Sequence, residues 1–133
     1  PRDLAETASG GEIARLMLAL KALVAGRRNL PSIVFDEIDT GVSGTMARRM
    51  GHLMRRMGNS VQVLCITHLP QIAALGTDHL RVAKHQRDGE TLSTLTRLTA
   101  DERINELATM LSGTEITPAA LANARELLDP NAQ

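Results

Sequence analysis

The sequence predicts an α/β fold built on a mainly parallel sheet, and two observations carry this prediction. The first is the succession of an apolar segment, an amphipathic helical pattern and a second apolar segment, which is typical of a βαβ unit with parallel strands. The second is helical periodicity before and after that unit, which provides helices to flank a sheet. With 133 residues, 43% hydrophobic, the chain is large enough for a core, although Phe35 is its one aromatic residue.

The first predicted helix runs from about Gly10 to Ala25. Ser9 and Glu12 have the S-x-x-E spacing of a capping box at its start. Gly26 is placed to end it. The apolar residues that recur along one face of this helix are Ile13, Leu16, Met17, Leu20, Leu23 and Val24.

The predicted βαβ unit begins with an apolar strand at residues 32–35. A helical stripe from Met46 to Met57 follows, and Gly58 is placed to end that helix. A second apolar strand runs from Val61 to Ile66. Because both segments are continuously apolar, we expect both strands to be buried. Arginine pairs, which suggest a solvated helix surface, occur at Arg27-Arg28, Arg48-Arg49 and Arg55-Arg56.

Turn and capping signals divide the rest of the chain. Pro70 to Leu75 predicts a short helix closed by Gly76, and Asp88-Gly89 predicts a hairpin turn between strands at residues 80–84 and 91–98. A helix is then expected from a capping box at Thr99 and Glu102 as far as Gly113. The last predicted helix starts with Thr117 as N-cap and Pro118 as first residue, and ends near Leu128.

Composition limits the function classes. Acidic and basic residues cancel at 15 each, so bulk charge gives no argument for nucleic acid. No apolar stretch reaches ~18 residues, so no membrane span is expected. The single cysteine, Cys65, lies in an apolar strand and is expected to be a core residue of a reducing compartment. Because the start has no signal-peptide form, we expect a cytoplasmic protein.

Ser9, Gly10 and Gly11 open the first helix and have the features of a phosphate contact. A helix start presents unpaired N–H groups and the positive end of the helix dipole. Two glycines remove the Cβ atoms that would keep a phosphate away, and the serine adds a hydroxyl. The alternative is a purely structural helix cap next to a flexible glycine pair.

Polar residues also follow both predicted strands, where open α/β sheets bind ligands. Asp36 is a candidate Mg²⁺ ligand through water, and Glu37 a candidate to polarise an attacking water. Thr67-His68 follows the second strand, where a neutral His68 can hydrogen-bond a γ-phosphate oxygen or the attacking water. The alternatives are solvated acids and an ordinary loop histidine. No G-x-x-x-x-G-K-[ST] phosphate loop occurs, so the chain has the features of half an ATPase.

These segments resemble the ABC-type ATPases, in the SMC-like variant of chromosome-maintenance and repair proteins. Residues 8–12 are similar to the signature motif, residues 32–37 to the Walker B strand, and Thr67-His68 to the switch histidine. The match is closest to a bacterial DNA repair branch of the family. Further segments similar to that branch are residues 35–44, 67–73, 106–108, 111–113 and 122–128.

The resemblance implies the C-terminal half of an SMC-like P-loop NTPase head, without the Walker A half. In this family an N-terminal half, beyond a long coiled coil, carries the Walker A lysine. The segments implied are a signature helix at 9–26, the Walker B strand and D-loop at 32–44, the switch-histidine strand and loop at 61–73, and a C-terminal hairpin and helices at 80–128.

Roles follow from the resemblance residue by residue. Asp36 would hold Mg²⁺, with Glu37 and His68 catalytic in the same head. Asp39 and Gly41 would lie in the D-loop, which touches the partner head. Residues that would contact the ATP of the partner head are Ser9, Gly10, Gly11 and Glu12.

The implied partners are the N-terminal half of the same protein, a second head, and DNA through the full-length protein, at the bacterial nucleoid. Ser43 stands where many relatives carry Asp, so the resemblance gives it no role. The implied activity is ATP hydrolysis, which we expect the isolated chain to lack. Two alternatives stay open: another coiled-coil chromosome-maintenance ATPase, and an interaction module that does not hydrolyse ATP.

Overall fold

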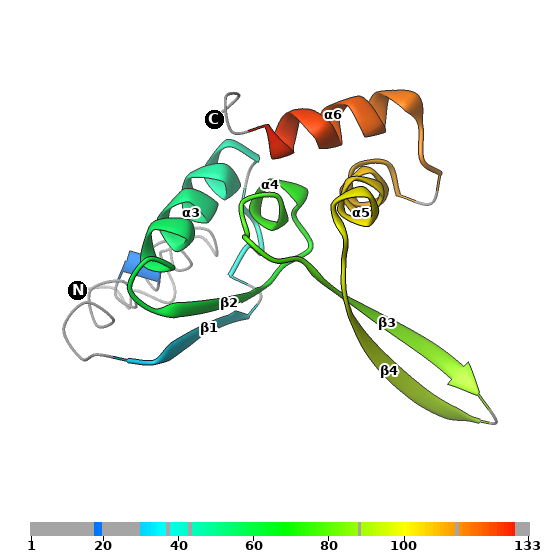
Figure 1. The fold of residues 1–133 in the computed structure, drawn as a ribbon, viewed down its shortest axis with the longest axis horizontal. Helices are drawn as coiled ribbons and strands as arrows, with labels where there is room; N and C mark the ends of the chain where they lie inside the picture. The colour runs from blue at the N-terminus through cyan, green and yellow to red at the C-terminus, as the bar shows by residue number, and fades with distance from the viewer. Residues whose placement is uncertain are drawn as a thin grey trace, which may run out of the picture. The chain divides into compact units, whose positions relative to one another are not determined.

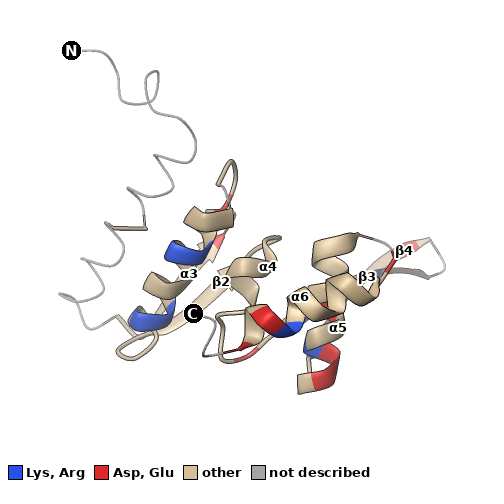
Figure 2. Ribbon diagram, turned by 90° about the horizontal axis from the view of Figure 1, so that it is seen from above, with Lys and Arg blue, Asp and Glu red and all other residues tan. Residues whose placement is uncertain are grey.

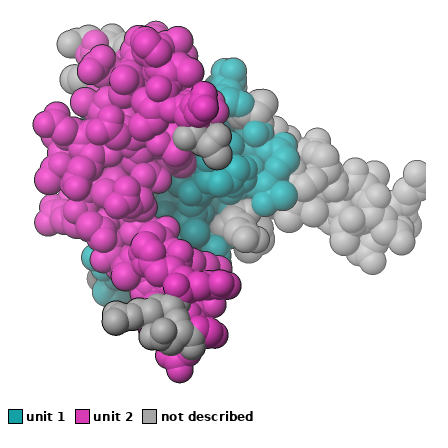
Figure 3. All heavy atoms as spheres, turned by 90° about the vertical axis from the view of Figure 1, so that its right-hand side faces the viewer, with its two compact units in different colours: residues 1–75 teal, residues 76–133 magenta. Residues whose placement is uncertain are grey.

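The computed structural model describes residues 18–19, 30–36, 38–42, 44–87, 89–113 and 115–129. Contacts group the chain into two compact units, residues 1–75 and 76–133, which Figure 3 colours separately. Most of the predicted first helix lies outside the described residues, although Leu18 and Ala19 are helical. The two units are described in turn.

The first unit contains the predicted βαβ arrangement (Figure 1). Strand β1 (Ser32–Asp36) is followed by helix α3 (Gly44–Met57) and strand β2 (Gln62–Ile66). The strands pair in parallel, with Ser32 opposite Gln62 and Asp36 opposite Ile66. The prediction of a parallel pair joined by a crossover helix is therefore confirmed, and the carboxyl ends of both strands lie at one edge.

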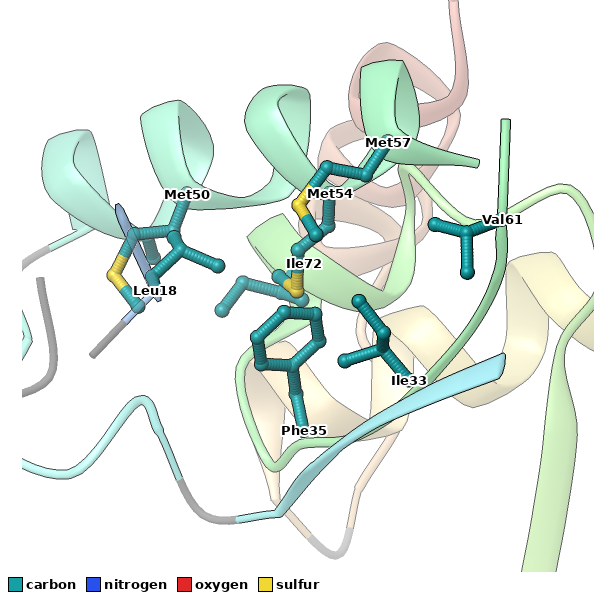
Figure 4. Packing of buried hydrophobic residues seen from close by; sticks show 9 residues of the cluster. Leu18, Ile33, Phe35, Met50, Met54, Met57, Val61 and Ile72 are labelled. Carbon is teal, nitrogen blue, oxygen red and sulfur yellow. The ribbon is translucent and has the colours of Figure 1, made fainter. Parts of the chain in front are cut away.

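The core of this unit lies between the sheet and α3. Ile33 and Phe35 project from β1 towards the helix, and Phe35 is completely buried (Figure 4). Methionine side chains from α3 close around this single aromatic ring, a use that suits their flexible, polarisable thioethers. The remaining members of the buried cluster are Leu18, Ala47, Met50, Met54, Met57, Val61 and Ile72.

The expectation that both strands are fully buried is wrong. Alternate residues of the sheet face away from α3, and Val34, Leu64 and Ile66 are 53%, 43% and 57% exposed. Successive side chains in a strand point to opposite faces, so one helical layer can bury only half of each strand. The described residues therefore leave an apolar sheet face open, where the sequence led us to expect a second covering layer.

A short helix, α4 (Pro70–Ala73), follows β2 and packs against α3. Gly51 permits this close approach, because a Cβ atom there would lie 2.6 Å from Leu75 Cδ1 and 3.5 Å from the Ile72 Cα. Ile72 is buried in the core of the unit. The loop between β2 and α4 is thus held at both ends by packed elements.

The second unit is a hairpin followed by two helices. Strands β3 (Leu80–Arg87) and β4 (Glu90–Arg97) pair antiparallel, joined at the predicted turn, where Gly89 has a φ of 82°. The first strand runs past its predicted end at Lys84, because backbone pairing continues through polar residues to Arg87 opposite Glu90. Apolar content alone could not predict that extension.

The helices of the second unit are α5 (Ala100–Ser112) and α6 (Pro118–Leu128), and both predicted starts are confirmed. The Thr99 side chain accepts a hydrogen bond from the Glu102 backbone, and Glu102 accepts one from the Thr99 backbone in return. The hydrogen bonds that the exposed Glu102 carboxylate accepts from the Thr99 backbone N–H and from the Thr99 hydroxyl lower the pKa of this carboxyl. The buried residues contributed by the two helices are Leu107, Ala108, Ala120 and Ala124.

The prediction of a solvated arginine surface is confirmed on α3 except at Arg48, which is half-buried. On α3, Arg49, Arg55 and Arg56 are exposed, and basic segments mark this helix in Figure 2. Within the described ranges, no helix combines the length and apolarity that crossing a membrane requires.

Candidate functional site at the strand ends

The parallel pairing brings the predicted site residues to one edge of the β1–β2 sheet. Asp36 is the last residue of β1 and is exposed, and it pairs with Ile66, the last residue of β2. Thr67 and His68 come directly afterwards. The expectation that Asp36 and His68 lie at the same strand edge is therefore confirmed by the register.

The loop after β1 folds back on itself through a tight turn. The Val42 N–H donates a hydrogen bond to the Asp39 carbonyl at 3.1 Å, and Gly41 has a φ of 71°. A positive φ at the third position of such a turn is one that glycine adopts without steric cost. The Asp39 side chain is only 1% exposed.

Asp39 joins this loop to the loop that follows β2, at Thr67 and His68. Its Oδ2 accepts a hydrogen bond from the Thr67 hydroxyl and a second from the His68 backbone N–H at 3.2 Å. The Thr67 Oγ1 in turn accepts from the Leu69 N–H at 3.0 Å. The ring of His68 also approaches, with Nδ1 3.4 Å from Asp39 Oδ2, while its side chain is 71% exposed. Sequence reasoning missed this network.

Cys65 lies next to the same carboxylate but has no reactive character. Burial, reinforced by the negative charge of Asp39, raises the pKa of the Cys65 thiol to about 11. The thiol is therefore protonated at neutral pH, whereas the thiolate is the nucleophilic form. Its half-buried position agrees with the prediction of a core residue.

Other predicted site residues lie outside the described residues. These are the catalytic candidate Glu37 and the residues predicted to form the signature, Ser9, Gly10, Gly11 and Glu12; Ser43, which has no predicted role, also lies outside them. Among the residues that the structure describes, no three His, Cys, Asp or Glu side chains gather as a metal site. A lone exposed carboxylate such as Asp36 still suits Mg²⁺, which takes most of its ligands from water and phosphate.

Solved structures with a similar fold are SMC heads. The chain matches one from work on ATP-driven dimerization and DNA-stimulated activation of SMC ATPases, with a TM-score of 0.66 and 24% identity over 83% of this chain and 66% of that one. It also matches an SMC head bound to the C-terminal winged-helix domain of ScpA, with a TM-score of 0.63 and 27% identity over 73% of this chain and 29% of that chain. The fold is that of a partial SMC-like ATPase head.

Sequence comparison with curated proteins finds similar proteins within this class. The chain is 47% identical over 127 residues to the DNA repair protein RecN of Vibrio cholerae, and 42% identical over 127 residues to that of Bacillus subtilis. The matches cover 96% of this chain but 23% and 22% of the relatives, in their C-terminal part. No family model matches. Over nearly its whole length the chain is thus similar to the C-terminal part of RecN proteins, and it spans about a quarter of the length of these relatives.

Proposed function

We propose that the chain is the hydrolytic half of a RecN-like ATPase head that acts in DNA double-strand break repair. The observation that carries this proposal is the shared strand edge, at which both Asp36 and His68 lie. The similarity to RecN supports the repair context, and that to SMC heads supports the ATPase class. Action on chromosomal DNA would place the protein at the bacterial nucleoid.

In this proposal Asp36, Glu37 and His68 have separate roles at this edge. Asp36 would hold Mg²⁺, which when bound neutralises charge on the phosphates. Glu37 follows Asp36 in sequence and would orient the attacking water, since a carboxylate is a suitable general base. His68 exposes its ring beside the same edge and would contact that water or the terminal phosphate.

A second head would complete each site. The signature residues Ser9, Gly10, Gly11 and Glu12 would contact ATP held by the partner head, and the turn at Asp39 and Gly41 would form the D-loop that touches this partner. The SMC ATPase match comes from work on ATP-driven dimerization, which supports an arrangement of two heads. DNA binding is proposed for the full-length protein.

The phosphate-binding half is proposed to come from the N-terminal part of the same protein. Nowhere in the 133 residues does a glycine-rich loop with a Gly-Lys pair occur. Such loops cradle phosphates with backbone N–H groups and a lysine. Titration of ATP into the chain alone and into the complete head tests this division of labour.

The open sheet face provides a prediction about association. Val34, Leu64 and Ile66 form an apolar patch beside β2, whose outer edge pairs with no described strand. Apolar surface and unpaired strand edges both favour association. We expect the isolated chain to self-associate in sedimentation velocity, or to be soluble only with its N-terminal half.

The double variant Leu64→Thr/Ile66→Thr should shift the chain towards monomer, because threonine keeps β propensity while reducing apolar surface. A matched control is Val82→Thr/Leu95→Thr on the hairpin, where both residues are similarly exposed. A monodisperse wild-type monomer at high concentration would count against association through this patch, as would equal effects of both double variants.

A further inference from the structure

We propose that Asp39 is a positioning residue, which holds the ring of His68 and places the imidazole proton on Nδ1. The D-loop assignment of Asp39 concerns a partner head, whereas this role lies within its own head. The catalytic consequence rests on the proposed ATPase function. The positioning itself can be tested without turnover.

Burial and geometry support this role. A carboxylate that is only 1% exposed must be offset by hydrogen bonds or charge. The contacts converge on Oδ2, which meets the Thr67 hydroxyl, the His68 N–H and the His68 ring. Oδ1 is buried and has no hydrogen-bond partner among the described residues. The carboxylate is therefore directed at Thr67 and His68 and not at the surface of the turn.

The chemistry of the pair favours one tautomer. An ionised carboxylate only accepts hydrogen bonds, so it stabilises a proton on the ring nitrogen that faces it. Nδ1 is that nitrogen, at 3.4 Å from Oδ2, a separation that can shorten when a catalytic site is completed. In the neutral ring Nε2 is then the acceptor.

An accepting Nε2 discriminates between the two tasks considered for His68. It can take a hydrogen bond from the attacking water, which is a donor. A phosphate oxygen offers no proton, so a neutral ring in this tautomer cannot bond to it through Nε2. The geometry thus favours His68 as the partner of the water.

The competing explanation is that Asp39 only ties two loops together. NMR of the ¹⁵N-histidine-labelled chain, combined with its unlabelled N-terminal half, separates the explanations, because ring nitrogen shifts report the tautomer directly. His68→Gln identifies the signals of His68 among the four histidines. The wild type should show mainly the Nδ1–H form, and Asp39→Ala should convert His68 to mainly Nε2–H. An unchanged His68 tautomer in a folded Asp39→Ala chain would overturn the proposal.

Turnover in the complete head gives a second, independent readout. Asp39→Asn retains an acceptor for Thr67 but removes the charge, and we expect kcat to fall about 10-fold, as for other groups that orient a functional histidine. In a His68→Gln head the same change should have little further effect, because the two residues act as a unit.

Equal losses from Asp39→Asn in both backgrounds would show a merely structural role and overturn the proposal. Failure of this proposal can also be distinguished from failure of the proposed function. If the wild-type complete head shows no ATP turnover, the proposed function fails, while the tautomer measurement still decides the role of Asp39.

Discussion

A complete head that carries Glu37→Gln is expected to lose ATP turnover by ~10²-fold or more, which is the range for a lost general base. Glutamine keeps the size and polarity of glutamate but cannot take a proton. ATP binding should survive, because most of the phosphate contacts are assigned to the other half of the head and none is assigned to Glu37. Engaged head dimers should therefore accumulate with ATP in sedimentation or cross-linking measurements.

The neighbouring residue offers a contrasting variant. Asp36→Asn removes the proposed Mg²⁺ ligand, so the metal dependence of ATP binding should change, whereas Glu37→Gln should leave it unaltered. Steady-state hydrolysis at saturating ATP and a magnesium titration separate these two effects. If Glu37→Gln hydrolyses ATP at the wild-type rate, Glu37 has no part in the mechanism.

A Ser9→Arg head should keep its own ATP affinity but fail to engage a second head. The family resemblance directs the signature helix start at the partner's nucleotide, and a bulky arginine there would fill the phosphate position. Hydrolysis that needs engagement should fall to background. When both are measured on the same preparation, nucleotide affinity should be unchanged and head dimerization should be lost.

Mixing variants distinguishes action across the interface from action within one head. When a Ser9→Arg head is tethered to a Glu37→Gln head and Ser9 acts across the interface, one composite site contains both lesions and the other contains neither. Partial hydrolysis should then return. If Ser9 acts within its own head, each site has one lesion. A tethered pair without recovered hydrolysis would contradict the assignment across the interface.

Much of the fold could be predicted because capping and turn patterns depend on residues that are close in sequence. The capping box at Thr99 and Glu102, the Thr117-Pro118 start and the turn before Gly89 all involve residues close in sequence. The parallel pair was predictable because a crossover helix leaves few other arrangements. The shared strand edge of the candidate site follows from that pairing.

What the sequence could not predict depends on contacts between distant residues. Asp39 and Thr67 are joined across two loops, so no local spacing indicates that the Asp39 side chain turns inward. The one-sided burial of the strands was missed for a related reason. A continuous apolar run indicates two covered faces, but the described residues cover only the face that carries Phe35.

The central claim is that this chain supplies the hydrolytic half of an ATP site and not the half that holds the triphosphate. Calorimetric titration with Mg²⁺ and ATP tests it most directly, using the chain alone, the N-terminal half alone, and both together. The account predicts no micromolar affinity for the chain alone, and binding by the combined halves followed by hydrolysis that requires Glu37. Micromolar ATP affinity of the isolated chain, or combined halves that bind ATP without hydrolysing it, would contradict the account.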